Sequence, residues 1–148
     1  MWIMNKLEEE IKEMVDRETR AWDSQDIELL MSIFHPDMVW PWPVNPNSHD
    51  PMDWVLVWGR YDYDRWKNGW QDLFDTHKLA HNHREIRKIL VSDEGDAGFA
   101  VVDIDTLWIH TVTGETNHWK GRVSKCFTLV NGEWKLIMHT GVLNYPPR

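Results

Sequence analysis

The chain has 148 residues, of which 42% are hydrophobic and 27% are charged, and these values are ordinary for one globular domain. Its formal net charge of -8 argues against a nucleic acid or an anionic membrane surface as a partner. A single cysteine, Cys126, excludes an intrachain disulfide, and the first residues carry charges where a signal peptide has its apolar core. We therefore expect one cytoplasmic domain over residues 1–148.

The first half of the chain contains the patterns of three helices. Over residues 5–22, apolar side chains recur at every third or fourth position, which is typical of an amphipathic helix. Asp26 can cap a second helix over residues 27–34. A third helix is predicted over residues 61–78, where the aromatic side chains share one face.

The strands follow the helices, apart from one short candidate over residues 38–40. A proline-rich loop at positions 41–51 comes next, and loops of this length in compact domains often bind ligands. Turn signals then separate four strand candidates, which cover residues 83–91, 98–110, 118–130 and 134–143. Helices followed by a run of strands predict an α+β fold, in which a curved antiparallel sheet wraps the N-terminal helices as a cone and leaves an internal pocket.

The last two strands are joined by Asn131-Gly132, the sequence most typical of a two-residue hairpin turn. A regular ladder from this turn would set Ser124 opposite His139 and Arg122 opposite Gly141. Polar side chains alternate with aliphatic ones along both arms, which favours the wall of a pocket over a plain core. A slip of one residue would reverse the two faces.

His139 is the first candidate for catalysis, because histidine gains and loses a proton near neutral pH. It would act as an acid or a base, with Ser124 or Arg122 as a polar neighbour that stabilises an oxyanion. The alternative is a histidine that bonds to the backbone or to water and has no chemical role. Ile137, two positions away, would line the same wall of the pocket.

Three carboxylates lie among apolar residues. Glu18 is on the apolar stripe of the first helix, where burial would raise its pKa and let it act as an acid or a base. The alternative is a side chain at the edge of the stripe that reaches solvent. Asp103 and Asp105 share one strand face. They form either a charged pocket floor, where Asp103 would contact a ligand, or part of a face that meets water, which is the favoured interpretation.

Tryptophan is the strongest anomaly of composition, with 11 residues in the chain. Several gather in the proline-rich loop and the third helix, which suits an aromatic cage for a flat or cyclic ligand. The tryptophans expected to bind a ligand are Trp22, Trp40, Trp42, Trp58, Trp66 and Trp70. Core packing or a dimer interface would use the same residue type.

The histidines form no metal-binding motif in the sequence. His81 and His83 are two positions apart and would share one strand face, but no cysteine or carboxylate joins them at a recognisable spacing. No phosphate loop or other cofactor motif is present. We therefore expect neither a metal ion nor a cofactor.

Three segments carry a resemblance to a known superfamily. Residues 22–40 are similar to its helix–turn–helix–strand opening, Gly59-Arg60-Tyr61 resembles its glycine before the third helix, and residues 132–139 resemble its last strand. In this order they resemble the nuclear transport factor 2-like superfamily, also called SnoaL-like or cystatin-like. The resemblance is closest to SnoaL-like proteins and to the association domain of calcium/calmodulin-dependent kinase II. It implies a homodimer through the sheet, while the superfamily's functions range from cyclases to oligomerisation modules.

The catalytic residues of the superfamily carry over poorly. The resemblance places Glu18 and Trp42 where ketosteroid isomerases have a catalytic tyrosine and aspartate, which argues against that type of isomerase. The first helix also lacks the Tyr–Asp pair of scytalone dehydratases. Asp103, Asp105 and Arg122 could be members of a relay like that of limonene epoxide hydrolases.

Two functions remain open at this point. The first is an enzyme that binds an apolar cyclic or aromatic metabolite and transforms it by cofactor-free acid–base chemistry, as a lyase, isomerase, cyclase or hydrolase. The second is a non-catalytic module that binds a ligand or assembles into oligomers. Exposure of the tryptophans distinguishes them, because an assembly module would bury these residues in a dimer contact.

Overall fold

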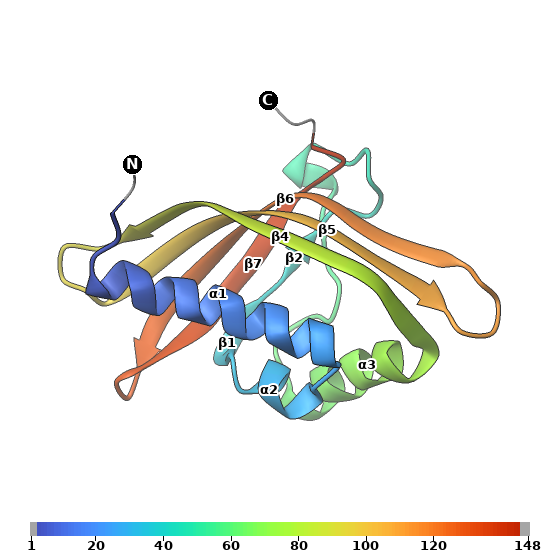
Figure 1. The fold of residues 1–148 in the computed structure, drawn as a ribbon, viewed down its shortest axis with the longest axis horizontal. Helices are drawn as coiled ribbons and strands as arrows, with labels where there is room; N and C mark the ends of the chain where they lie inside the picture. Colours follow the sequence, from blue (N-terminus) through green and yellow to red (C-terminus); the bar gives the residue numbers. More distant parts are fainter. Residues whose placement is uncertain (1–2, 146–148) are drawn as a thin grey trace.

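Long strands dominate the structure, a computed structural model that describes residues 3–145. The main sheet has five strands in the order β1-β7-β6-β5-β4 (Figure 1). They are β1 (Phe34–Val39), β4 (His77–Val91), β5 (Ala97–His110), β6 (Thr116–Val130) and β7 (Glu133–Leu143). Neighbouring strands are antiparallel except β1, which runs parallel to β7. The predicted α+β fold is confirmed, with one parallel pair in a sheet that was expected to be wholly antiparallel.

Three helices accompany the sheet: α1 (Lys6–Ser24), α2 (Ile27–Met31) and α3 (Tyr63–Thr76). The longest, α1, lies across the curved sheet (Figure 1). Asn5 caps it, because its side chain accepts a hydrogen bond of 2.9 Å from the backbone amide of Glu8. A Cβ added at Gly98 in β5 would lie 2.4 Å from Cδ1 of Ile11. The glycine therefore lets α1 pack closely on the sheet.

Several elements begin or end at residues other than the predicted ones. α2 ends at Met31 instead of residue 34, because the carbonyl of Ile33 accepts a hydrogen bond of 2.8 Å from the amide of Leu136 in β7. This bond draws the chain into the sheet, so β1 begins at Phe34 instead of residue 38. β4 begins at His77, directly after α3, instead of at residue 83.

The proline-rich segment has structure that the sequence did not predict. β2 (Pro41–Trp42) pairs antiparallel with β3 (Val55–Leu56), and a short 3-10 helix, η1 (Pro51–Asp53), lies between them in the chain. β2 also contacts β7. The segment is thereby held against the sheet.

The Asn131-Gly132 turn forms as predicted, with φ of 52° and 81° at the two positions. Beyond the turn, Ile137 and Met138 together lie opposite Cys126, which makes a β-bulge. The bulge shifts the pairing of the two strands by one residue. The regular ladder expected from the turn is therefore wrong from Cys126 onward, away from the turn.

The shifted ladder changes the neighbours of the candidate residues. His139 pairs with Lys125 instead of Ser124, and Arg122 pairs with Val142 instead of Gly141. His139 is buried on the inner face of the sheet, while Ser124 and Arg122 alternate onto the outer face. The same inner face packs on α1 and α3 to form the core. In the described part of the chain, no helix combines the length and apolar character needed to span a membrane.

Candidate functional site

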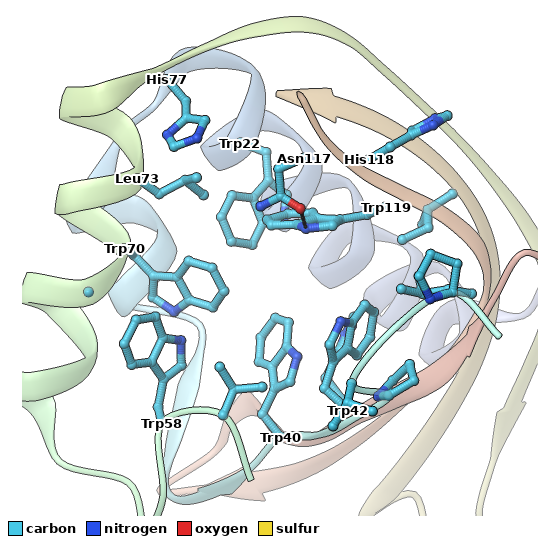
Figure 2. A pocket seen from close by; sticks show the side chains of 18 of the residues that line it. Trp22, Trp40, Trp42, Trp58, Trp70, Leu73, His77, Asn117, His118 and Trp119 are labelled. Carbon is cyan, nitrogen blue, oxygen red and sulfur yellow. Dashed lines mark hydrogen bonds between the residues drawn. The ribbon is translucent and has the colours of Figure 1, made fainter. Parts of the chain in front are cut away.

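A cavity of about 680 Å³ lies between α1, α3, the proline-rich segment and the inner face of the sheet (Figure 2). Its volume falls within the range of small-molecule sites. Aromatic rings make up most of the wall, as Figure 2 shows. The tryptophans that line it are Trp22, Trp40, Trp42, Trp58, Trp70 and Trp119.

The tryptophans predicted to bind a ligand differ at two positions from those that line the cavity. Trp66 does not line the cavity; it is fully buried, and its ring makes edge contacts with Phe34 and Tyr61 in the core. Trp119 was missed, although alternation along β6 from the buried Val123 would have placed it on the inner face.

A group of buried polar side chains, called the floor below, lies beside the cavity: Glu18 and His139 belong to the cavity lining, and Lys125 contacts both without lining the cavity itself. Lys125 Nζ donates a hydrogen bond of 2.7 Å to Oε1 of Glu18 and lies 2.8 Å from Nδ1 of His139. Oε2 of Glu18 also accepts a bond of 2.9 Å from Nε1 of Trp22. Glu18, Lys125 and His139 are at most 2% exposed. These contacts therefore form away from water, where each is electrostatically stronger.

Arg84 is a second buried cation beside this floor. Its Nη1 lies 3.9 Å from Oε2 of Glu18, and its other nitrogens donate to Asn82 at 2.7 Å and to Thr106 at 3.1 Å. Burial lowers the pKa of Arg84, but a guanidinium stays charged at neutral pH. Two cations, Lys125 and Arg84, thus accompany one carboxylate of the cavity lining, Glu18, while the exposed Asp23 also acts on Arg84; the cavity side of the floor favours an anionic or electron-rich ligand group.

Burial and charge set the protonation of the floor. Burial lowers the pKa of Lys125 to about 8, although Glu18 opposes this shift. Burial alone would raise the pKa of Glu18, as the sequence predicted, but the charges of Lys125 and Arg84 lower it to about 2. Burial and the Lys125 charge hold the pKa of His139 well below its ordinary value. At neutral pH the floor therefore holds a carboxylate, an ammonium and a neutral imidazole.

His139 presents one ring nitrogen to the cavity. Its ring stacks on Trp40 and on Trp42, with ring centroids 4.0 and 5.4 Å away. Because the ammonium of Lys125 can only donate, Nδ1 of His139 accepts, and the ring proton is on Nε2. Among residues 3–145, no group forms a hydrogen bond with Nε2, and His139 lines the cavity. The Nε2–H group is thus a donor available to a ligand.

Two indole groups of the wall also lack acceptors. Nε1 of Trp58 and Nε1 of Trp70 are buried, and neither has a hydrogen-bond partner within residues 3–145. Buried N–H groups are nearly always paired in proteins, and both rings line the cavity. The core residues Trp66 and Trp108 share this lack of a partner within the described part of the chain, so it is a general consequence of packing many indole rings together and does not mark the cavity.

Sequence reasoning identified Glu18 and His139 but missed the two cations. Lys125 occupies an inner-face position between the buried Val123 and Phe127. A charge within that apolar alternation was the available signal. Arg84 gave no comparable signal, because its partners Glu18 and Thr106 lie on other elements.

Four other predicted site residues lie away from the cavity lining. Ser124, Arg122 and Asp103 are on the outer face, and Ile137 belongs to the bulge. Arg122 donates two hydrogen bonds to Asp103, of 2.7 and 2.9 Å. The oxyanion role of Ser124 and Arg122 beside His139 is therefore corrected, because the bulge leaves them on the opposite face. A relay built on Asp103 and Arg122 would likewise face away from the cavity.

The outer face brings together three residues from neighbouring strands. Nε2 of His81 in β4 and Nε2 of His118 in β6 lie 2.8 and 2.6 Å from the same oxygen, Oδ1 of Asp105 in β5. The sequence places these residues far apart, so spacing alone could not reveal the group. Asp105 therefore belongs to a surface cluster, in agreement with the favoured interpretation that its face meets water.

Comparisons with known proteins identify the fold. No family model matches the chain, and no curated protein matches its sequence. A ketosteroid isomerase-like protein from Erwinia carotovora atroseptica superposes with a TM-score of 0.71 at 15% identity, over 97% of this chain and 100% of that one. A nuclear transport factor 2-like protein from Cytophaga hutchinsonii gives 0.69 at 16% identity, over 95% and 99%.

A proposed calcium/calmodulin-dependent kinase II association domain from Exiguobacterium sibiricum gives a TM-score of 0.66 at 8% identity, over 99% of this chain and 100% of that one. The predicted resemblance is thus confirmed at the level of structure. The chain has the nuclear transport factor 2-like fold. At such low identities the likeness extends to the fold alone.

Proposed function

We propose that this protein is a small enzyme that binds an apolar cyclic or aromatic metabolite and transforms it by cofactor-free acid–base chemistry at His139. The observation that carries the proposal is the 2.8 Å contact between Lys125 and Nδ1 of His139. It connects a lysine of lowered pKa to one side of the imidazole, while the other side belongs to the cavity wall. Such a pair can deliver a proton to a bound molecule.

The composition of the cavity supports the proposed ligand class. Tryptophan rings offer flat apolar surfaces, which suit a cyclic or aromatic skeleton. The Nε2–H group of His139, which has no hydrogen-bond partner within residues 3–145, favours a ligand with an oxygen acceptor. The excess positive charge of Lys125 and Arg84 favours a ligand whose oxygen becomes negative during the reaction.

The proposed proton transfer uses both nitrogens of His139. Nε2–H gives its proton to an oxygen of the ligand, and Nδ1 takes a proton from the ammonium of Lys125. The imidazole stays neutral, Lys125 becomes a neutral amine, and the reverse transfer restores the resting state. Glu18 positions Lys125 and keeps its own charge, since its pKa of about 2 leaves it a carboxylate throughout. Protonation of a substrate oxygen is common to the lyase, isomerase, cyclase and hydrolase reactions considered.

A thermal-shift screen tests the proposal with cyclic ketones, aromatic acids, epoxides and polyketide-like phenols. A ligand at a hundred times its Kd stabilises the folded state by about 2.7 kcal/mol, or about 5–10 °C for a chain of this size. We expect hits on the wild type that weaken in His139→Gln but persist in His35→Gln, a histidine outside the cavity lining. Hits of equal strength in His139→Gln would reject its role in binding.

The reaction itself needs a second measurement. Each hit is incubated with protein and followed by NMR for a change of structure. We expect turnover that is lost in His139→Gln and that declines above about pH 8, where Lys125 loses its proton. A ligand that binds at the cavity and stays chemically unchanged would contradict the enzymatic role.

The second candidate is a non-catalytic module that assembles as a homodimer through the outer face of the sheet. Half-buried apolar residues on that face, such as Phe99, Val101 and Leu107, favour it. Sedimentation velocity over a range of concentrations tests assembly. A stable dimer with no ligand in the screen would support the module, whereas a monomer at all concentrations would exclude it.

A further inference from the structure

We propose that His81, Asp105 and His118 form a binding site for a divalent transition-metal ion of the zinc class on the outer face of the sheet. The three side chains already converge, because both histidines direct Nε2 at Oδ1 of Asp105, from 2.8 and 2.6 Å. Their ligand atoms all lie within 4.8 Å of one another. This site is separate from the proposed chemistry at His139.

The ligand set matches the chemistry of such ions. Imidazole nitrogen and carboxylate oxygen bind zinc at about 2.0–2.2 Å, and three protein ligands leave a position for water. Ligands of a tetrahedral zinc ion lie about 3.4 Å apart, as follows from those bond lengths. The contacts to Asp105 need to lengthen by less than about 1 Å to reach this value, which small side-chain rotations provide.

The strands hold the three ligands in place. His81 and His118 both lie opposite Leu107 of β5, one from each neighbouring strand, and Asp105 lies two residues away on the same face. The ring of His83 stacks on His81, with centroids 4.9 Å apart and planes at 20°. The pairing of the three strands therefore brings the ligand residues to one place on the outer face.

The three ligand residues are accessible to solvent, so a metal ion can enter and leave the site. The side chains of His81, Asp105 and His118 are 33%, 31% and 43% exposed, so an ion can enter and keep water ligands. His118 also borders the aromatic cavity (Figure 2), whereas His81 and Asp105 are not part of its lining.

Two other charged or titratable groups border Asp105. Lys120 lies directly opposite it on β6, and His83 lies opposite it on β4. The Lys120 charge opposes a cation, whereas the carboxylate of Asp105 attracts one.

The test uses full-length protein without a histidine tag, stripped with chelator and titrated with Co²⁺ by visible absorption and with Zn²⁺ by calorimetry. We expect one equivalent of each ion, with the intense visible bands of Co²⁺ in a site of low coordination number. Asp105→Asn and His118→Ala should each weaken Zn²⁺ binding by at least about tenfold. His83→Phe keeps an aromatic ring against His81 and offers no ligand atom, so its binding should match the wild type.

Thermal unfolding in chelator shows whether each variant folds, and a variant that unfolds is replaced by His81→Gln. Saturable binding that depends on the three ligand residues and not on His83 supports the site. Absent or non-saturating binding would overturn it. Equal weakening in His83→Phe would also overturn it, because the response would then be a general property of surface histidines.

Discussion

The ammonium of Lys125 lies 2.8 Å from Nδ1 of His139, with both side chains almost fully buried. This contact fixes the tautomer of the imidazole, because Nδ1 must accept and Nε2 must carry the proton. It also explains why two cations can lie beside the single carboxylate of Glu18. Lys125 donates to His139, which stays neutral because burial and the lysine charge lower its pKa.

Removing Lys125 alone should strongly destabilise the fold. Lys125→Met leaves Glu18 buried without its closest cation, and breaking a buried pair in this way costs about 3–5 kcal/mol of the free energy of unfolding. Lys125→Met combined with Glu18→Gln removes both charges and keeps an acceptor for Trp22 Nε1. We expect the double variant to recover most of the loss, as measured by urea unfolding.

The exposed pair of Lys12 and Asp16 on α1 is the matched control, since its side chains are 41% and 39% exposed. Lys12→Met should cost less than about 1 kcal/mol. A double variant at Lys125 and Glu18 whose loss equals the sum of the two single losses would contradict the coupling seen in the structure.

Acid should destabilise the protein partly through His139. Its pKa is well below the ordinary value in the folded state, so the unfolded state binds more protons below about pH 6.5 and stability falls as pH falls. Between pH 7.5 and 5.5 this single group accounts for a loss of about 1 kcal/mol. Urea unfolding at both pH values gives the decrease in the free energy of unfolding between pH 7.5 and 5.5. This decrease should be smaller by that amount in His139→Gln than in the wild type. An unchanged loss would mean that His139 binds protons equally in the folded and unfolded states, so that folding does not lower its pKa.

Glu18 should add to this effect at lower pH. Its pKa falls from an ordinary value to about 2 on folding, so its contribution is present above about pH 4.5 and is lost as pH falls toward 2. Thermal unfolding between pH 5 and 3 should therefore be less steep in the double variant Glu18→Gln with Lys125→Met than in the wild type. Equal slopes would show that Glu18 gains no stabilisation from its cations.

A side chain at Gly69 should displace the Trp58 ring of the cavity wall and leave the free energy of unfolding nearly unchanged. A Cβ at this position of α3 would lie 2.5 Å from Cη2 of Trp58. Alanine stabilises a helix by about 1 kcal/mol relative to glycine, which offsets the overpacking because the half-buried Trp58 can move. We expect the free energy of unfolding of Gly69→Ala to lie within about 1 kcal/mol of the wild-type value. Iodide should quench its tryptophan fluorescence more strongly, because the displaced Trp58 is more exposed. Asn68→Ala, at the exposed neighbouring position, should leave quenching unchanged.

The sequence was most informative where the cause of structure is local. The spacing of apolar residues in α1 and the Asn131-Gly132 turn depend on residues close in the chain, and both were predicted. The pair of Glu18 and Lys125 spans 107 positions, so no local pattern could reveal that this lysine is buried and paired. The convergence of His81 and His118 on Asp105 was hidden for the same reason.

The β-bulge is the local feature that the sequence did not predict, and it decides which face carries the site. Without it, strict alternation along β7 from the buried Trp134 and Leu136 puts His139 on the outer face. With Ile137 and Met138 opposite the single residue Cys126, His139 returns to the inner face. The prediction that His139 faces the cavity was right, although its supposed partner Ser124 was not.

Deleting Ile137 should remove the bulge and leave the site intact. Cys126 would then face Met138 alone, while the pairs on either side, including Lys125 with His139, need not change. The ring protons of His139 should keep the upfield NMR shift expected from its stack on Trp40, 4.0 Å away. Ile137→Ala is the control, because it loses the side chain but keeps the bulge. We expect it to lower the free energy of unfolding by about 1–2 kcal/mol. If the deletion instead gives His139 an ordinary titration near pH 6.5 and no upfield shift, the strand has slipped and the bulge itself holds His139 at the cavity.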